Sequence, residues 1–552
     1  MSDPTHDPGP HRFATHEVTN QPPRLEPFDA WQLDAPLREA VLRHGADDVV
    51  LLQRYARWVG QELTELGFEA NRHKPTLHNF DRHGHRIDAV EFHPSYHRIM
   101  LEAMRHGVHA HAWRSTHDGA HVTRAALSYL HHQGEAGTSC PLTMTFAALP
   151  VLRQGGADLV DWVRGATALD YDSADAAAAG KRALTLGMGM TEKQGGSDVR
   201  ANSTRAHPAG GGAYELVGHK WFFSAPMSDG FLVLAQAPGG LSCFLMPRRR
   251  DDGTRNAFQV MRLKDKLGNW ANASSEIEFV GAEARLIGDE GRGIATILEM
   301  VALTRLDCAL GSAAEMRRAL LEAVHHARHR RTFGRLLIEH PLMREVLADL
   351  ALEVEASVAL VFRIAAAVDA APRSAHEAAF ARIATALGKY WICKRSVGVV
   401  NEAQECLGGA GYVEESILPR LYREAPLNAI WEGSGNIQCL DVLRALRREP
   451  ASLQALLDEL RRDAPVDPGY HARLEELLAM LQADDGSLER GARRLVGGLA
   501  QLLQANLLHR HAPPEIARTF LVARLLAAPG MYGSSLPEDA PIALLLERAL
   551  AG

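Results

Sequence analysis

The sequence predicts an α+β protein that is mainly α-helical, and three successive hydrophobic patterns along the chain support this prediction. Apolar residues recur at helical spacing in the first third, short alternating runs with glycine-rich turns follow, and long helical stripes occupy the rest. A Leu-rich tail after a proline-containing break adds a further segment. We therefore expect four units, at residues 1–183, 184–287, 288–448 and 449–552.

The first unit is expected to be helical, with an N-terminal extension. Residues 40–66 and 96–108 carry apolar side chains at helical spacing between proline and glycine breaks. Histidines are also concentrated in this unit, and no His-Glu-x-x-His pattern accompanies them. Ordinary polar and capping roles are therefore the better interpretation, and we predict no metal site. These histidines include His83, His85, His93, His97, His109 and His111.

The second unit is predicted to be a small β-barrel or sandwich. Its apolar and polar residues alternate in four short runs, at 214–217, 231–236, 242–246 and 276–280. Residues 288–293 then satisfy a G-x-x-G-x-G pattern, but no strand–helix–strand context surrounds it. We interpret this glycine-rich segment as the start of a helix rather than as a dinucleotide fingerprint.

Long helices are expected after residue 294. The clearest apolar stripes, at 356–371 and 378–400, predict a helical bundle in which the stripes form the core. Beyond a linker-like break at 463–469, leucines recur at helical spacing over 474–481, 495–508 and 516–526. This tail predicts an additional helical domain.

Composition limits the classes of function. The 552 residues carry a formal net charge of −7, which gives no global attraction to nucleic acid, so any DNA contact must come from a local basic surface. The six cysteines are far apart and form no C-x-x-C pair, which favours a reducing compartment, and we predict the cytoplasm. Residues 1–10 lack the features of a signal peptide, and no run of eighteen apolar residues occurs, so we predict neither secretion nor membrane insertion.

One carboxylate stands inside an apolar run at residues 430–438, which read I-W-E-G-S-G-N-I-Q. Beside Ile430 and Trp431, Glu432 is expected to be desolvated and more basic, because burial disfavours the charged form. Such a group can take a proton from a weakly acidic carbon. For this motif alone, a solvated glutamate in a helix-starting turn is an equally good interpretation.

Further motifs decide between these interpretations. Residues 187–199 read G-M-G-M-T-E-K-Q-G-G-S-D-V, residues 217–224 read V-G-H-K-W-F-F-S, and residues 330–334 read R-R-T-F-G. With the Glu432 motif, they resemble the acyl-CoA dehydrogenase family of FAD enzymes, which carries T-E-x-x-x-G-S-D, G-x-K-x-W-I-T-N, R-x-x-F-G and Y-E-G-T-x-x-I-Q. Residues 263–269 and 419–424 resemble the alkylation-response branch more than the fatty-acid enzymes. The resemblance covers most of the chain.

The resemblance implies the fold of that family: an N-terminal helical domain, a middle β-barrel and a C-terminal four-helix bundle, extended here by the additional helical domain. It also implies FAD and a homotetramer. Dehydrogenation of a thioester requires a base for the carbon acid and a hydride acceptor, and flavin supplies the acceptor. By resemblance Glu432 is the base. Some members place the base at a helix position that corresponds to Thr304, which cannot do this work.

The same resemblance assigns the cofactor contacts. Phe222 stands where the family usually has Trp, so stacking is retained without the indole N–H. Arg330 and Phe333 match residues that reach the FAD diphosphate and adenine from a neighbouring subunit. Glu405 stands where many members have Gln, and it would either weaken phosphate binding or contact a ribose. The predicted contacts are Met190, Thr191, Gly196, Ser197, Phe222, Phe223, Ser224, Arg330, Thr332, Phe333, Gly408, Gly409, Ser434 and Asn436.

Three functions are compatible with these motifs. The first is a flavoprotein that binds double-stranded DNA and protects it from alkylation, with weak acyl-CoA dehydrogenase activity. The second is a metabolic acyl-CoA dehydrogenase that acts on a short or branched acyl-CoA without binding DNA. The third, a flavin oxidase resembling nitroalkane oxidases, is disfavoured because that branch tends to carry Asp at the base position.

The candidates for DNA contact are Arg444, Arg447 and Arg448. Acidic residues follow them in the tail, so charge alone favours a solvated face, whereas the resemblance favours DNA. Phosphate contacts would make binding independent of sequence and sensitive to salt.

Overall fold

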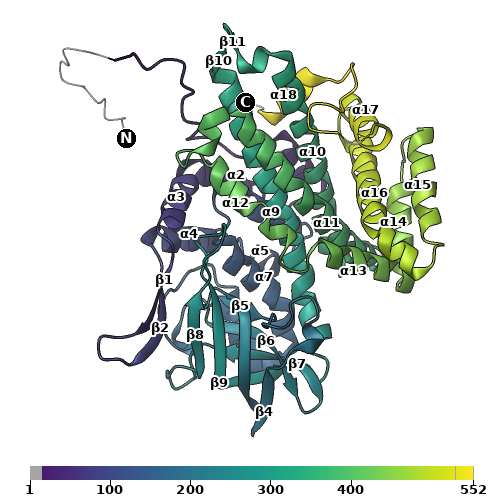
Figure 1. Cartoon of the computed structure of the whole chain (residues 1–552). Helices are drawn as coiled ribbons and strands as arrows, with labels where there is room; N and C mark the ends of the chain where they lie inside the picture. Colours follow the sequence, from purple (N-terminus) through teal and green to yellow (C-terminus); the bar gives the residue numbers. More distant parts are fainter. Residues whose placement is uncertain (1–14, 529, 551–552) are drawn as a thin grey trace.

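The computed structural model describes residues 15–528 and 530–550, so residues 1–10, for which we predict no signal peptide, lie outside it. The strands of the middle region gather at one end of the molecule, the long helices rise from them towards a short hairpin of residues 331–336 at the opposite end, and the C-terminal helices pack along one side (Figure 1). This arrangement confirms the predicted α+β, mainly α class. No helix in the described part of the chain is long and apolar enough to cross a membrane.

The N-terminal region is mainly helical, but the stripe at residues 40–66 is not one helix. Gly45 adopts a φ of +68° and turns the chain, and the Asp48 carboxylate then accepts a hydrogen bond from the N–H of Leu51 at the start of the next helix. The helices of this region are α1 (Ala35–Arg43), α2 (Val49–Trp58), α3 (Thr64–Arg72), α4 (Pro94–Arg105), α5 (His111–Arg114), α6 (Ala120–Gly134), α7 (Ser139–Gln154) and α8 (Val160–Ala166).

This region also contains an antiparallel hairpin that sequence reasoning missed, formed by β1 (Thr76–Phe80) and β2 (Arg86–Glu91). Both strands are half-exposed and carry polar residues, so they lack a clear apolar face. Asp88 and Val90 of β2 are the two buried residues of these strands, and the Asp88 carboxylate pairs with Arg86 and Arg255.

The middle region forms a closed barrel. Strands β6, β4, β5, β9 and β7 pair in that order, and β7 pairs back with β6, so the ring closes. Strand β3 adds to β6 in parallel, and β8 adds to β9. Of the two predicted architectures, a barrel and a sandwich, the closed ring of strands is the barrel. Its strands are β3 (Leu186–Gly189), β4 (Arg205–Gly210), β5 (Ala213–Ser224), β6 (Gly230–Ala237), β7 (Gly240–Pro247), β8 (Phe258–Leu263) and β9 (Ser274–Ile287).

The helical bundle begins at the glycine-rich segment, as predicted. Gly293 starts the 37-residue helix α9 against β7, where a Cβ atom would lie 2.5 Å from the carbonyl carbon of Ser242. Only glycine allows the helix to leave the barrel at this close distance. The other helices are α10 (Pro341–Ala370), α11 (Ala375–Cys406), α12 (Leu418–Glu424) and α13 (Gly435–Arg448), and a short hairpin of β10 (Arg331–Thr332) and β11 (Arg335–Leu336) follows α9.

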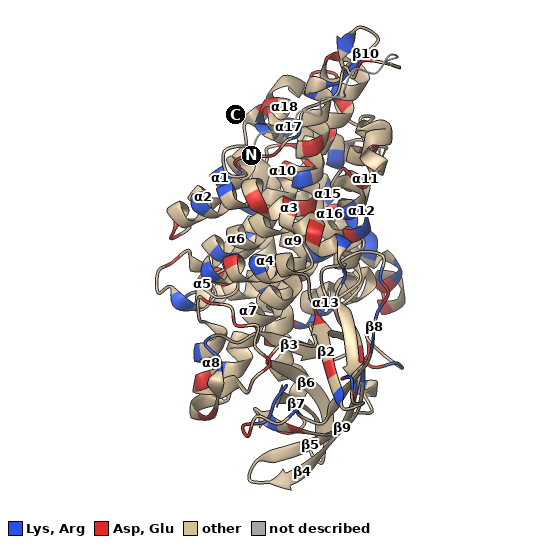
Figure 2. Cartoon of the chain, turned by 90° about the vertical axis from the view of Figure 1, so that its left-hand side faces the viewer, with Lys and Arg blue, Asp and Glu red and all other residues tan. Residues whose placement is uncertain are grey.

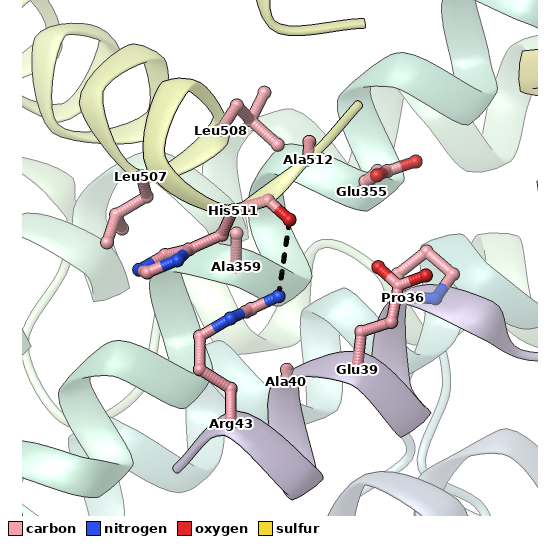
Figure 3. A pocket seen from close by; sticks show the side chains of 10 residues that line it. All are labelled: Pro36, Glu39, Ala40, Arg43, Glu355, Ala359, Leu507, Leu508, His511 and Ala512. Atoms are coloured by element: carbon pink, nitrogen blue, oxygen red, sulfur yellow. Dashed lines mark hydrogen bonds between the residues drawn. The ribbon is translucent and has the colours of Figure 1, made fainter. Parts of the chain in front are cut away.

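The tail forms helices that pack on the bundle and on α1. Arg43 of α1 meets His511 of the tail across a small cavity and donates to its carbonyl oxygen, so segments far apart in sequence lie side by side (Figure 3). The tail helices are α14 (Pro450–Arg461), α15 (Pro468–Met480), α16 (Asp485–His511), α17 (Pro514–Leu521) and α18 (Ile542–Ala549).

Buried ion pairs fix this tail to the bundle. Glu459 of α14 is fully buried and accepts two hydrogen bonds from Arg363 of α10, at 3.0 and 2.9 Å, and another from Arg510 of α16. Burial alone would raise the pKa of Glu459, but the two arginines outweigh it and lower the pKa to about 2. This carboxylate therefore joins three helices.

Replacing Glu459 by Ala is expected to destabilise the packing of the tail by about 3–5 kcal/mol, because the buried Arg510 loses its counter-charge and Arg363 keeps only its pair with Glu377. The contribution of Glu459 is present above a pH of about 4.5 and is lost as the pH falls towards 2, since pairing depresses its pKa. Thermal unfolding at neutral pH tests this, with the exposed Glu475→Ala as the control. Equal unfolding temperatures for both variants would contradict the role of Glu459.

Candidate active site

Glu432 lies in a strained loop just before α13. Its φ is +57° and that of Gly433 is +93°, so two successive residues are left-handed. Arg305 and Gln438 donate to the Glu432 carbonyl oxygen at 3.1 and 3.0 Å. Lys389 donates to the carbonyl oxygens on either side, those of Trp431 and Gly433, at 2.7 and 2.5 Å. Bonds to three consecutive carbonyls therefore hold the loop in this conformation.

The side chain of Glu432 has one fixed oxygen and one free oxygen. The Thr304 hydroxyl of α9 donates to Oε2 at 2.7 Å, whereas Oε1 has no hydrogen-bond partner among residues 15–528 and 530–550. Burial raises the pKa of the Glu432 carboxyl, and Thr304, Lys389 and Arg305 only partly offset this effect. The rise agrees with the sequence expectation. The sequence analysis considered Thr304 only as a residue that cannot act as the base. It did not predict the contact between Thr304 and Glu432.

A buried ion pair fixes the loop that follows β3. Glu192 and Lys220 are both fully buried, and their Oε1 and Nζ atoms are 2.8 Å apart. Glu192 also accepts from the N–H groups of Ser203 and Thr204, at 2.6 and 3.1 Å. Burial would raise the pKa of Glu192, but Lys220 and these hydrogen bonds hold it well below its usual range. Both charged residues stand inside the predicted flavin motifs, yet sequence reasoning did not single them out.

The predicted flavin residues of the barrel lie around this loop. The N–H of Trp221 donates to the carbonyl oxygen of Thr191 at 2.8 Å, which ties the loop to β5. Along β5, Phe222 is 51% exposed, whereas Phe223 is fully buried in the barrel, with its ring centroid 4.4 Å from that of Phe231. Phe222 can therefore offer a ring to a cofactor, and Phe223 can offer only backbone atoms.

The barrel loop and the Glu432 loop meet at one apolar cluster. Met190 and Trp431, both half-buried, pack against a cluster that includes Cys140, Met144 and Leu303. Gly196 and Ser197 are exposed in the same loop as Met190, and Ser224 lies 3.4 Å from Ser274 at the end of β5. Ser434 and Asn436 open α13 directly after Glu432, and Asn436 accepts a hydrogen bond from Arg493 of the tail at 2.9 Å.

The remaining predicted cofactor residues are far from Glu432 in the same chain. Arg330 caps the C-terminus of α9, and at about 1.5 Å per residue it lies roughly 40 Å along the helix axis from Thr304. Thr332 and Phe333 follow in the hairpin, where Phe333 is 96% exposed at a φ of +48°. Gly408 and Gly409 are exposed at the C-terminal end of α11, remote along that helix from Lys389. One chain cannot bring both groups together.

The three arginines predicted to contact DNA differ in their surroundings. Arg447 pairs with Asp485 and also donates to the carbonyl oxygen of Ala483 at 3.0 Å. Arg444 and Arg448 are exposed and have no ion pair in the described part of the chain. The structure therefore separates one internally paired arginine from two that face solvent.

One group of possible metal ligands occurs within residues 15–528 and 530–550, formed by Glu69, His73 and His93. Its ligand atoms lie within 4.8 Å of one another. However, Arg72 pairs with the Glu69 carboxylate at 2.6 Å, and the N–H of Ser95 donates to Nδ1 of His93 at 3.3 Å. The protein itself thus engages two of the three side chains, and we assign no metal role to them.

Three family models match the chain. Residues 20–173 match the adaptive response protein AidB N-terminal domain, residues 187–282 the acyl-CoA dehydrogenase middle domain, and residues 291–447 the acyl-CoA dehydrogenase C-terminal domain. AidB of Escherichia coli (strain K12), which is named as an acyl-CoA dehydrogenase, is 49% identical over 88% of this chain and 86% of its own length.

Two comparisons with Caenorhabditis elegans proteins extend this similarity. Acyl-CoA dehydrogenase family member 11 is 31% identical over 82% of this chain and 73% of its own length. The crystal structure of ACDH-11 in complex with C11-CoA superposes with a TM-score of 0.84 and 26% identity, over 98% of this chain and 94% of that one.

Proposed function

The chain belongs to the acyl-CoA dehydrogenase family of FAD-dependent oxidoreductases, and on this premise we propose that it is an alkylation-response flavoprotein. In this proposal it binds double-stranded DNA, protects it against alkylation damage and retains weak activity on acyl-CoA thioesters. The identity of 49% with AidB over 88% of the chain supports this branch of the family. The desolvated Glu432 carboxylate with one free oxygen is the observation that carries the chemical part.

FAD is the cofactor of this family, which confirms the cofactor predicted from the motifs. The residues present fit a flavin, because the hydroxyls of Thr191, Ser197 and Ser434 make no hydrogen bond within the described residues and remain available to it. The half-exposed ring of Phe222 adds a surface for stacking. When bound, FAD supplies the acceptor for the hydride that leaves the substrate.

Glu432 supplies the proton acceptor in this proposal. Thr304 holds Oε2, so Oε1 is the atom that takes the proton from the carbon next to the thioester carbonyl. Burial makes this carboxylate more basic, and Trp431, packed on the apolar cluster, limits the access of water. The thioester then gains a carbon–carbon double bond as the hydride leaves the neighbouring carbon.

We propose a homotetramer in which Arg330 and Phe333 contact the FAD of a neighbouring subunit. The separation of roughly 40 Å along α9 supports this arrangement, because it removes Arg330 from the Glu432 site of its own chain. The exposure of Phe333 also supports it, since this residue is 96% exposed at the tip of a hairpin. Phosphate oxygens suit the guanidinium group of Arg330.

We also propose that the protein works in the cytoplasm. All six cysteines are free and buried, which suits a reducing compartment.

The alternative is a metabolic acyl-CoA dehydrogenase that acts on a short or branched acyl-CoA and does not bind DNA. Lys and Arg are interspersed with Asp and Glu on the side of the molecule that Figure 2 shows, and the net charge is −7. The pairing of Arg447 with Asp485 also reduces the basic surface of the tail. These observations favour the alternative, so DNA binding is the property that separates the two functions.

Replacing Glu432 by Gln is expected to slow the reduction of bound flavin by acyl-CoA by about 10²–10⁴-fold, because an amide cannot accept the proton. Anaerobic stopped-flow absorbance with a series of acyl-CoA chain lengths measures this rate. The spectrum of the oxidised, flavin-loaded variant should match that of the wild type, which controls for loss of FAD. A wild-type rate of reduction would place the base elsewhere.

Replacing Thr304 by Val is expected to move the acidic limb of the pH–rate profile to higher pH. Glu432 must be ionised to act as a base, and Thr304 stabilises the ionised form, so losing this donor raises the pKa of Glu432 further. Flavin reduction followed across a pH series tests this. Thr296→Val, on the same helix but bonded to the Arg292 carbonyl, is the matched control. An unchanged limb would show that Thr304 does not tune the base.

Charge reversal of Arg444 and Arg448 to Glu is expected to weaken DNA binding and to reduce its salt slope by about 0.9 for each phosphate that is no longer neutralised. Charge reversal of Arg447 should have a smaller effect, because this side chain already pairs with Asp485. Fluorescence anisotropy with a labelled duplex across a salt series measures both quantities on flavin-loaded protein.

If the double variant binds DNA as tightly as the wild type, these two arginines do not form the DNA surface. If the wild type does not bind the duplex even at low salt, the metabolic alternative is the better function.

A further inference from the structure

The N-terminal segment before α1 contacts the hairpin at the far end of α9, more than 300 positions later in the chain. The side-chain amide of Asn20 donates through Nδ2 to the carbonyl oxygen of Arg331 at 2.9 Å. Its Oδ1 accepts from the N–H of the same residue at 2.7 Å. The amide of Asn20 thus pairs with Arg331 as a neighbouring strand would, and it satisfies both backbone groups of the first hairpin residue.

The backbone of the same segment holds side chains of α9. The guanidinium group of Arg330 donates to the carbonyl oxygen of Asn20 at 2.6 Å. Nε2 of His325, one turn earlier, lies 2.9 Å from the carbonyl oxygen of Pro23, which can only accept. Asn20 is therefore the residue at which the segment meets both Arg330 and the hairpin that follows it.

The identity of the residue suits this position. Asn20 has a φ of +57°, in the left-handed region that asparagine adopts more readily than most residues. An amide also provides a donor and an acceptor on one planar group. In Asn20→Asp the side chain would keep the acceptor oxygen and lose the N–H donor. In Asn20→Gly the backbone could keep its left-handed conformation, but both side-chain hydrogen bonds would be lost. These substitutions therefore separate the contribution of the side-chain amide from that of the backbone conformation.

The hairpin needs such external support. Strands β10 and β11 have two residues each, and a two-stranded ribbon of this size is not stable alone in water. Its tip presents Phe333, whose side chain is almost fully exposed. The contacts from Asn20 limit the directions in which Arg330 and this tip can point.

We propose that Asn20 is a positioning residue that aligns Arg330 and the hairpin for the FAD of the neighbouring subunit, and thereby sets how tightly the assembled protein holds FAD. This inference rests on the proposed function, because it requires the hairpin to reach a cofactor in another chain. Within the described residues, the hydrogen bonds of Asn20 all go to Arg330 and Arg331.

The experiment compares Asn20→Gly, Asn20→Ala and Asn20→Asp with Gln21→Ala in the full-length, FAD-loaded protein. Gln21 is the matched control, because its side-chain amide reaches only the Thr19 carbonyl oxygen. The dissociation constant for FAD, measured by flavin fluorescence on dilution, should rise about tenfold or more in the Gly and Ala variants. The Asp variant should fall between these variants and the wild type, and Gln21→Ala should not differ from the wild type.

Two further measurements test whether Asn20 acts through Arg330. Arg330→Ala should itself weaken FAD binding, and the Asn20→Gly/Arg330→Ala double variant should be no weaker than Arg330→Ala alone. Thermal unfolding and light scattering control for a general loss of structure, which would lower the unfolding temperature without following this non-additive pattern.

The outcomes distinguish the inference from the function on which it rests. If Arg330→Ala loses FAD and Asn20→Gly retains it, the positioning role of Asn20 is wrong and the hairpin role stands. If Arg330→Ala itself retains FAD fully, the hairpin does not contact the cofactor, and the intersubunit part of the proposed function fails as well. Additive effects of the two substitutions would also overturn the proposal.

Discussion

Helix α9 carries Thr304 in its first third and ends at Arg330, and the fixed distance between these two residues limits how this protein can be organised. A continuous helix of 37 residues does not fold back, so the residue that contacts the base and the residue predicted to bind FAD phosphate cannot meet within one chain. Gly293 fixes the start of the helix on the barrel, and Asn20 holds the hairpin at its other end. This geometry supports the proposed contact of Arg330 with a neighbouring subunit, whereas the number of four subunits rests on the family resemblance.

The Glu432 loop shows how a carboxylate can remain basic beside two cations. Lys389 donates to backbone carbonyls, and Arg305 donates to the Glu432 carbonyl and pairs with Asp441 at 2.7 Å. Both cations stabilise the strained loop, but neither forms an ion pair with the carboxylate, which would have depressed its pKa. The only hydrogen bond to the carboxylate within the described residues comes from the neutral hydroxyl of Thr304, so the effect of burial prevails.

Local features of this protein could be predicted from sequence, whereas contacts between distant segments could not. The barrel strands and the start of α9 follow from hydrophobic period and glycine spacing. The raised pKa of Glu432 agrees with the expectation, although of its two apolar neighbours only Trp431 packs into the interior, since Ile430 is 64% exposed. The hairpin of β1 and β2 escaped detection because its half-exposed strands have no apolar face. The pairing of Asn20 with Arg331 and of Arg447 with Asp485 depends on tertiary packing, which carries no local signal.

The tail uses several of its arginines internally, which limits the surface that could bind DNA. Arg510, Arg524 and Arg548 join buried carboxylates, and Arg493 contacts Asn436 at the predicted flavin site. Within the described residues, Arg444 and Arg448 are among the basic groups left facing solvent beside this tail.

In one subunit, a pair of phosphate contacts gives weak, salt-sensitive affinity for DNA. A tetramer would repeat the pair four times, and the high effective concentration of the linked copies could then produce tight binding from individually weak patches. Assembly through the α9 hairpin would in that case support both cofactor retention and DNA affinity, so the two properties would weaken together when the tetramer dissociates.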